Sequence, residues 1–256
     1  MTPKKSLGQH WLYDEESLLA MCNAAELTSD DNVVEIGPGL GTLTKYLVTR
    51  AGSVTAVEFD EDLYRKLPKN VQADNLKIVH GDCLTFDYGS MPAGYKVVAN
   101  IPYYLTSNLL RVLSEAPNPP ATIVLLVQKE VAERVAAIPG QMSILSVSVQ
   151  LYYEASLEKV VRAELFTPPP KVDSQIIRLE RRQQPLFEDL DTQKYFRIVK
   201  AGFSQKRKKL RSSLSAGLHI SKDEASELLQ SAGVDPSCRP QELSLEQWNT
   251  LMNSFA

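Results

Sequence analysis

The segment Asn100-Ile101-Pro102-Tyr103-Tyr104 carries residue types that could hold a planar amine such as an adenine. The Asn100 side-chain carbonyl can accept a hydrogen bond from an exocyclic amine. Pro102 has no N–H and a fixed φ, so it can hold a turn that aims the Ile101 or Pro102 carbonyl at the same amine. Tyr103 offers a flat face on which a base can stack. An ordinary strand-to-helix turn capped by the Asn explains the segment equally well.

A glycine-rich segment upstream could hold a nucleotide-like cofactor. Gly37, Gly39 and Gly41 follow a strand predicted at 33–36 and open a predicted helix. Glycines at such a junction let a ligand approach the backbone and meet the free N–H groups of the helix end. The spacing is Gly-x-Gly-x-Gly with Glu35 before it, rather than the Gly-x-Gly-x-x-Gly of dinucleotide sites. This pattern resembles methyltransferases more than dehydrogenases.

Two acidic residues stand at the ends of the next two predicted strands. Glu58 closes the strand at 53–58, where a carboxylate can accept hydrogen bonds from both ribose hydroxyls. Asp82 follows the strand at 76–80. Because the carboxyl ends of parallel strands share one edge of a sheet, these acids and the glycines are expected to define one cleft. The alternative for each acid is a solvated carboxylate in a turn.

The elements that must position these residues alternate between strands and helices. A helix is predicted from Asp14, its N-cap, to Ala25. The alternation that follows predicts an α/β fold with a Rossmann-like, doubly wound, mostly parallel sheet. We expect strands at about 143–151 and 174–180 to pair antiparallel at the sheet edge, because the connection through three prolines contains no crossover helix. The other predicted elements are strands at 95–99 and 121–127 and helices at about 42–51, 61–67, 105–115 and 129–137.

The pattern changes beyond Arg182, where no further strand is predicted. Helices are expected at about 191–202, 206–216, 221–232 and 244–255. Ser244 to Gln247 fits a capping box at the start of the last helix. We therefore predict a catalytic domain at 1–182, a linker near 183–185 and a small all-helical domain at 186–256.

The distribution of charge is more informative than its total. The formal net charge is only −3 in a chain with 43% hydrophobic residues, which argues neither for nor against a polyanionic partner. Between Lys194 and Arg211 there are eight basic residues and no acidic one. Such a run repels itself unless a polyanion is bound, although a solvated helix face is the usual explanation for a charge run.

Other features limit the class of protein. No run of about 18 apolar residues occurs, and the first residues are polar rather than an apolar signal core, so we expect a cytoplasmic protein with no membrane partner. The three cysteines are far apart, without Cys-x-x-Cys or a His at metal-binding spacing. Structural thiols in a reducing compartment are favoured, and no metal site is predicted.

Several ordered motifs together resemble the S-adenosylmethionine-dependent rRNA adenine N6-methyltransferases, which have the class I methyltransferase fold. The resemblance is strongest to the small-subunit rRNA adenine dimethyltransferases of the kasugamycin-resistance type. It covers nearly the whole chain. The motifs that carry it are Lys5 to Gln9, Val34 to Thr44, Asn100 to Tyr103, Phe166 to Ser174 and Phe203 to Leu210.

The resemblance implies methyl transfer from S-adenosylmethionine to N6 of two adjacent adenosines near the 3′ end of 16S rRNA in the small ribosomal subunit. It implies a cofactor site made of His10, Leu12, Gly37, Gly39, Gly41, Glu58, Asp82 and Asn100. It implies a catalytic set of Asn100, Ile101, Pro102, Tyr103 and Phe166, in which Phe166 either closes the second face of the base or serves packing. The RNA contacts would be Arg197, Lys200, Lys206, Arg207, Lys208, Lys209 and Arg211.

One position departs from the family pattern. The family usually has Asn-Phe-Leu where this chain has His10-Trp11-Leu12, so the side-chain contact of His10 with the cofactor is an open question. We expect a monomer that uses no metal. The resemblance also implies a role in small-subunit biogenesis beside catalysis. Two other functions fit parts of the pattern: a large-subunit rRNA adenine N6-methyltransferase of the macrolide-resistance type, and a non-catalytic ribosome assembly factor that recognises immature subunits.

Overall fold

The computed structural model describes residues 8–205 and 207–255 and divides into two compact units. The sheet unit comprises the described residues up to Glu133 together with Tyr153–Arg181. The helical unit comprises Arg134–Tyr152 and the described residues from Arg182 onward. The division differs from the predicted continuous domain at 1–182, because residues 134–152 pack with the helical unit.

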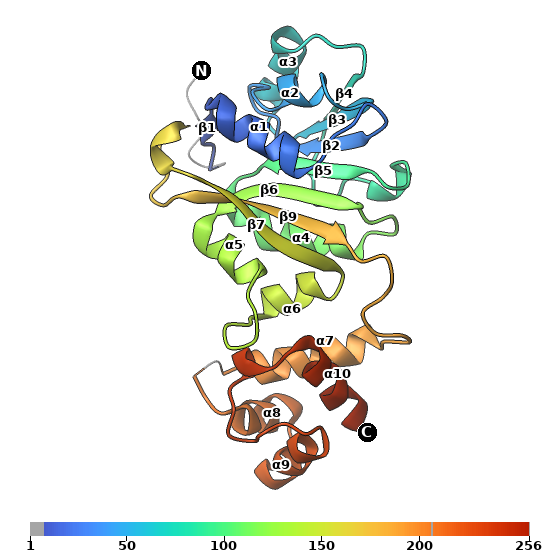
Figure 1. Cartoon of the computed structure of the whole chain (residues 1–256), viewed down its shortest axis with the longest axis vertical. Coiled ribbons are helices and arrows are strands. Elements are labelled where there is room, and N and C mark those ends of the chain that lie inside the picture. Colours follow the sequence, from blue (N-terminus) through green and yellow to red (C-terminus); the bar gives the residue numbers. More distant parts are fainter. Residues whose placement is uncertain (1–7, 206, 256) are drawn as a thin grey trace. The chain divides into compact units, whose positions relative to one another are not determined.

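The sheet unit is built on a seven-stranded sheet with the order β4-β3-β2-β5-β6-β9-β7 (Figure 1). The five strands from β4 to β6 in this order are parallel, whereas β9 is antiparallel to both β6 and β7. This confirms the predicted doubly wound, mostly parallel sheet. The strands are Asn32–Ile36 (β2), Ser53–Glu58 (β3), Leu76–His80 (β4), Lys96–Asn100 (β5), Thr122–Gln128 (β6), Tyr153–Val161 (β7) and Ser174–Arg181 (β9).

The strand order of the sheet determines where a ligand can bind. The chain runs from β2 outward to β3 and β4, and then returns to place β5 on the other side of β2. The point between β2 and β5, where the order reverses, is where open α/β sheets form a crevice at the carboxyl ends of their strands. The central strands are almost wholly buried and apolar, as is expected when helices cover both faces of a sheet.

The helices of the sheet unit begin where the sequence provides caps. The Asp14 carboxylate accepts a hydrogen bond from Ser17 N at the start of α1, and the Asp60 carboxylate accepts one from Asp62 N at the start of α3. Figure 1 shows α1 on the near face of the sheet and α4 behind it. The helices are Glu15–Ala24 (α1), Thr44–Leu47 (α2), Glu61–Asn70 (α3), Thr106–Glu115 (α4) and Lys129–Val135 (α5), with short 3-10 turns at Tyr88–Ser90 (η2), Tyr103–Leu105 (η3) and Ala163–Leu165 (η4).

The prediction of a strand at 143–151 is wrong, because this segment forms helix α6 (Ile144–Gln150). Ser143 caps the helix and forms a capping box with Ser146. Val147 and Leu151, spaced four residues apart, pack in the core of the helical unit. The alternation of Ser and Val in this segment imitates the two-residue period of a strand, whereas the tertiary contacts use the helical spacing. The edge strand that pairs with β9 is β7, which begins two residues after the end of the predicted strand.

The helical unit packs around one large buried residue. The Trp248 side chain is fully buried, and its ring lies 5.6 Å from that of Phe203 between centroids. A Cβ added at Gly202 would lie 2.4 Å from the Trp248 ring, so only glycine fits there. The predicted capping box from Ser244 to Gln247 is confirmed. Besides α6 and a 3-10 turn at Pro240–Glu242 (η5), the helices are Thr192–Phe203 (α7), Leu210–Leu218 (α8), Lys222–Ser231 (α9) and Leu245–Ser254 (α10).

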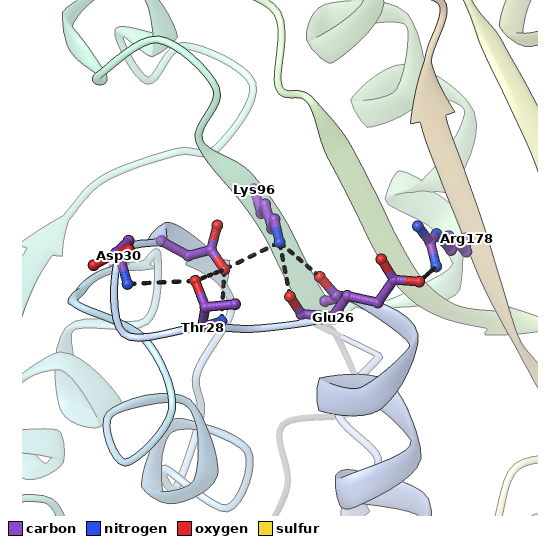
Figure 2. Close-up of polar contacts among 7 residues, drawn as sticks. Glu26, Thr28, Asp30, Lys96 and Arg178 are labelled. Carbon is purple, nitrogen blue, oxygen red and sulfur yellow. Dashed lines mark hydrogen bonds and ion pairs between the residues drawn. The ribbon is translucent and has the colours of Figure 1, made fainter.

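The amino ends of the sheet strands carry a fully partnered polar cluster (Figure 2). The Lys96 ammonium at the start of β5 donates to the carbonyls of Ala25 and Glu26 and to the carboxylate of Asp31, each at 3.0 Å. The Glu26 carboxylate pairs with Arg178 of β9. Burial opposes ionisation of Asp31, but hydrogen bonds from the Thr28 N–H and from Lys96 outweigh it and lower the pKa of that carboxyl. The cluster fastens the end of α1 to two strands.

No helix in the described part of the chain is long and apolar enough to cross a membrane.

Candidate cofactor and base site

A cavity of about 320 Å³ lies at the carboxyl ends of β2, β3, β4 and β5. This strand-end cavity is within the size range of small-molecule sites. Its walls come from five segments that are far apart in sequence. They are residues 8–12, residues 35–43 without Gly41, residues 57–63, residues 81–84 and residues 100–105, although not every residue of 57–63 contributes. The structure thus brings the predicted glycine loop, acidic residues and Asn100 segment to one place.

The glycine loop reaches the cavity through two of its three glycines. Gly37 and Gly39 line the cavity and have φ angles of +64° and +59°, which favour glycine. Gly41 is not part of the lining. A Cβ at Gly41 would lie 2.6 Å from Val71 and 2.9 Å from Leu67, so this glycine lets the loop pack closely. In this structure Gly41 shapes the loop, and its predicted cofactor contact stays a prediction.

Glu58, at the end of β3, lines the cavity and holds the glycine loop. One carboxylate oxygen accepts a hydrogen bond from Gly39 N at 3.0 Å, and the other accepts one from Asp60 N at 2.8 Å. Burial raises the pKa of the Glu58 carboxyl, while these backbone donors oppose the rise. Each oxygen keeps a second lone pair that could accept a hydrogen bond from a ligand.

Glu35, at the end of β2, is a site residue to which the sequence analysis gave no role of its own. Its side chain is buried and lines the cavity, and its Oε2 has no hydrogen-bond partner among the described residues. Burial raises the pKa of this carboxyl to about 8. A buried acceptor without a partner is rare, and a ligand donor is one way to satisfy it. The available signal was an acid inside the apolar run of a central strand.

Asp82 and Asn100 also line the cavity. The Asp82 carboxylate accepts a hydrogen bond from Leu84 N at 2.9 Å, which fixes the turn after β4. Asn100 is the last residue of β5, and its side-chain amide has no partner among the described residues. Both residues lie where the sequence placed them.

The residues after Asn100 form a rigid turn on the cavity wall. The Tyr103 hydroxyl lies 2.7 Å from the Ser174 hydroxyl at the start of β9, and this hydrogen bond orients the ring. The Pro102 carbonyl accepts from Leu105 N at 3.0 Å within the 3-10 turn. The neighbouring Ile101 carbonyl is therefore the better of the two predicted acceptors for an incoming amine.

The described part of the N-terminal arm, residues 8–12, lies along the cavity and is fastened at three points. Gln9 donates to the Asp60 carboxylate at 3.3 Å. His10 Nδ1 lies 2.7 Å from the carbonyl oxygen of Pro168. The two-residue strand β1 (Trp11–Leu12) pairs antiparallel with β8 (Phe166–Thr167). The sequence did not predict this pairing, because two residues are too few to show a strand period.

The position of Phe166 bears on the two roles that the resemblance implied for it. Its side chain is only 3% exposed and packs in the core of the sheet unit with Leu12 and Leu18. It is not part of the cavity lining. Pairing of β8 with β1 turns the Phe166 side chain into the core, so the structure favours the packing role.

Comparison with known proteins identifies the family. Residues 1–256 match the family model for ribosomal RNA adenine dimethylases. The chain belongs to this family. It is therefore a ribosomal RNA adenine dimethylase, an S-adenosylmethionine-dependent methyltransferase. This confirms the resemblance that the sequence motifs indicated.

Curated relatives and solved structures agree with the family. The chain is 40% identical over 257 residues to the ribosomal RNA small subunit methyltransferase A of Dehalococcoides mccartyi, with 99% of this chain and 88% of the relative covered. It is 38% identical to the protein of the same name from Moorella thermoacetica, with 100% and 93% covered. The structure is similar to that of a dimethyladenosine transferase from Plasmodium falciparum, with a TM-score of 0.80, 25% identity, and 94% of this chain and 96% of that chain covered. It is also similar to that of the 23S rRNA methyltransferase ErmE, with a TM-score of 0.77, 31% identity, and 95% of this chain and 98% of that chain covered.

The predicted RNA-binding residues of this dimethylase belong to the helical unit. Arg197 and Lys200 lie on α7, Arg211 lies on α8, and Lys206 is outside the described residues. The remaining three, Arg207, Lys208 and Lys209, lie in the connection between these helices. Of these residues, the described ones other than Arg211 are exposed, and Arg211 is half-buried. None of the described ones forms an ion pair with another described residue. Their charge is available to an external anion.

Residues 8–205 and 207–255 contain no cluster of three or more His, Cys, Asp or Glu side chains that could hold a metal ion. The three cysteines are free, and burial raises the pKa of each thiol to about 11.

Proposed function

We propose that this dimethylase transfers methyl groups from S-adenosylmethionine to N6 of two adjacent adenosines near the 3′ end of 16S rRNA in the small ribosomal subunit. The observation that carries the proposal is that one cavity holds both the glycine loop and the Asn100 segment. The choice of the small subunit is supported by relatives at 38–40% identity that bear that name.

The cavity residues fit the chemical groups of the cofactor. Backbone groups of Gly37 and Gly39 would lie close to the cofactor. The Glu58 carboxylate would accept hydrogen bonds from the ribose hydroxyls of the cofactor, and the Asp82 carboxylate would accept one from its adenine amine. The unpartnered oxygen of Glu35 suits a cationic N–H donor such as an ammonium group. When bound, S-adenosylmethionine supplies an electrophilic methyl group on a positively charged sulfur.

The protein then has to orient the amine and exclude water. Asn100 Oδ1 and the Ile101 carbonyl would accept hydrogen bonds from the N6 amine, and Tyr103 would stack on the base. In this position the N6 lone pair would form the new N–C bond while the bond from the methyl group to sulfur breaks, and one proton would leave the product nitrogen for solvent. A second round would replace the remaining N–H. The base must leave its RNA stack to reach the cavity. No metal is needed for these steps.

The helical unit would position the rRNA through its phosphates. Five of the predicted contacts are exposed cations that form no ion pair with the described residues, namely Arg197, Lys200, Arg207, Lys208 and Lys209. Such contacts supply affinity without reading sequence. Reversing the charges of Lys208 and Lys209 should weaken binding to the subunit and reduce the steepness of its salt dependence. Unchanged binding and salt dependence would contradict this assignment.

We further propose that the protein works as a monomer in the cytoplasm and has no membrane partner.

The proposed function is tested by incubating the purified protein with methyl-labelled S-adenosylmethionine and unmethylated small or large subunits. The label is then mapped by nuclease digestion and mass spectrometry. Dimethyladenosine in the small-subunit RNA is the expected result. Label in the large subunit would support the second candidate, which the similarity to the 23S rRNA methyltransferase favours. Tight binding to small subunits without any label would indicate an assembly factor instead.

A further inference from the structure

An exposed aromatic ring lies on the wall of the strand-end cavity, next to the Asn100 segment. Tyr104 is 62% exposed and lines the cavity. Among the described residues, Phe59 is the other large apolar side chain that is both exposed and part of the lining, and it follows Glu58 at the end of β3. The Tyr104 ring therefore belongs to the part of the lining that would receive the adenine, and Phe59 to the part proposed for the ribose of the cofactor.

The backbone on both sides of Tyr104 is fixed. Leu105 N donates to the Pro102 carbonyl at 3.0 Å, and the Thr106 hydroxyl donates to the Tyr103 carbonyl at 3.0 Å. These bonds hold the 3-10 turn η3 that leads into α4. The Tyr104 hydroxyl has no hydrogen-bond partner among the described residues. The turn, and not the hydroxyl, therefore sets the position of the ring.

The N-terminal arm passes beside this ring without covering it. A Cβ added at Gly8 would lie 3.6 Å from two carbon atoms of the Tyr104 ring, which is an ordinary van der Waals contact. Because residue 8 is a glycine with a φ of +61°, no side chain occupies that contact. An open aromatic face on a rigid turn is what stacking with a base requires.

The proposed substrate supplies a base that needs such a face. The adenosine that is methylated has to leave the RNA stack to reach the cavity. The base that adjoins it in the strand then loses a stacking contact on one face. Tyr103 and Tyr104 are consecutive, so their Cα atoms are about 3.8 Å apart. A nucleotide next to the one held at Tyr103 therefore comes within reach of the Tyr104 ring.

We propose that Tyr104 stacks on the base of the nucleotide that adjoins the methylated adenosine. The proposal rests on the proposed function, because it requires an adenosine within an RNA strand as substrate. In this assignment Tyr103 contacts the reacting base, and Tyr104 replaces the stacking contact that the neighbouring base loses. Tyr104 thereby favours the flipped state of the RNA, and its contribution depends on the neighbouring base rather than on the cofactor.

A simpler role for Tyr104 would be packing against the arm at Gly8, and two substitutions separate the roles. Tyr104→Phe keeps the ring and removes the hydroxyl. Tyr104→Leu keeps an apolar side chain beside Gly8 but has no flat ring. The assay measures kcat/KM for methyl transfer to unmethylated small subunits, and calorimetry measures the affinity for S-adenosylhomocysteine. Tyr13→Ala is the matched control, because Tyr13 is a 53% exposed aromatic residue that does not line the cavity.

We expect Tyr104→Phe to retain kcat/KM within about threefold and Tyr104→Leu to lose about 5- to 50-fold, which is within the range for loss of one base–aromatic stack. Affinity for S-adenosylhomocysteine should change by less than about threefold in both variants, and Tyr13→Ala should behave as the unsubstituted protein. Equal activity of the two variants would overturn the proposal, because packing needs only apolar bulk and a role of the hydroxyl would impair both. A matching loss of affinity for S-adenosylhomocysteine would assign Tyr104 to the cofactor instead.

The neighbouring base itself is tested with small subunits reconstituted on 16S rRNA in which one of the two adjacent adenosines is replaced by an abasic nucleotide. One such substrate lacks the base on the 5′ side of the target, and the other lacks the base on its 3′ side. With one of the two, the unsubstituted protein should lose about 5- to 50-fold in kcat/KM, and Tyr104→Leu should lose no more than about threefold beyond that. A loss from Tyr104→Leu that persists in full on both substrates would overturn the proposal. So would a complete loss of transfer to both, because a single stack cannot account for it.

Failure of this inference can be told apart from failure of the proposed function. If the unsubstituted protein transfers no methyl group to intact small subunits, the proposed function fails and the stacking assignment fails with it. Transfer by the unsubstituted protein together with full activity of Tyr104→Leu would reject the stacking assignment alone.

Discussion

The two ends of the parallel strands differ in whether their polar groups have hydrogen-bond partners. At the amino ends, the Lys96 ammonium has three oxygen partners at 3.0 Å, and Asp31 is held ionised by surrounding donors. At the carboxyl ends, Glu35 keeps a buried carboxyl oxygen without a partner and has its pKa raised to about 8. The Asn100 amide is also unpartnered within the described chain. One end is complete without a ligand, and the other is complementary to one.

The difference has an energetic meaning. A buried polar group without a partner costs about 1–3 kcal/mol, whereas hydrogen bonds to a charged group contribute about 1.5–3 kcal/mol each. The amino-end cluster therefore stabilises the fold and offsets the cost of the buried, unpartnered oxygen at the site. Substitutions at the amino end should lower stability and spare ligand binding, whereas substitutions at the carboxyl end should impair cofactor binding or methyl transfer without lowering stability.

The largest effect is expected for Asn100→Ala. The variant removes an acceptor for the amine and should lower the single-turnover rate of methyl transfer about 100- to 1000-fold, as loss of one positioned hydrogen-bonding group does in other active sites. Affinity for S-adenosylhomocysteine should stay nearly unchanged, and so should the free energy of unfolding. Asn23→Ala, on the exposed face of α1, serves as the control and should leave all three quantities unchanged. Equal loss of transfer and cofactor affinity would remove the assigned role.

Lys96→Met should disrupt the polar cluster at the amino ends of the strands. It leaves the Asp31 carboxylate and two carbonyl oxygens without their shared donor, and the Lys96 side chain is only 15% exposed. We expect a loss of about 3 kcal/mol in the free energy of unfolding, measured by urea titration. Arg111→Met is the control, since its pair with Glu115 is 61% and 52% exposed and should contribute less than about 1 kcal/mol. Weakened cofactor affinity without lost stability would mean that the two ends are not separable.

The same contrast explains what the sequence could predict. Central strands and their terminal residues follow from local patterns, so Glu58, Asp82 and Asn100 were placed correctly at one edge of the sheet. The α6 segment was misassigned because its core contacts come from distant helices. Likewise, the β1 and β8 pairing joins residues about 155 positions apart in two-residue strands, and this pairing is what buries Phe166. Long-range contacts that leave no local period were the ones that sequence reasoning missed.

The smallest effect is expected for Glu35→Gln and depends on pH. The Glu35 pKa is about 8 in the folded protein against an ordinary value of 4.5, so the folded state keeps a proton that the unfolded chain releases. Below pH 4.5 both states are protonated, and stability falls as the pH rises from 4.5 through about 8. Between pH 6 and 8 this group should account for about 2 kcal/mol of the loss.

Glutamine cannot ionise, so Glu35→Gln should flatten that slope while Glu115→Gln, at an exposed site, should not. Urea titrations of the unsubstituted protein and of both variants at pH 6, 7 and 8 measure the slope of the free energy of unfolding against pH. The variant should also weaken S-adenosylmethionine binding, because a cationic donor favours the ionised form of the Glu35 carboxyl and an amide has no ionised form. An unchanged slope would show that Glu35 ionises normally in the folded protein. The unpartnered Asn100 amide would then be the remaining sign that the carboxyl ends of the sheet are complementary to a ligand.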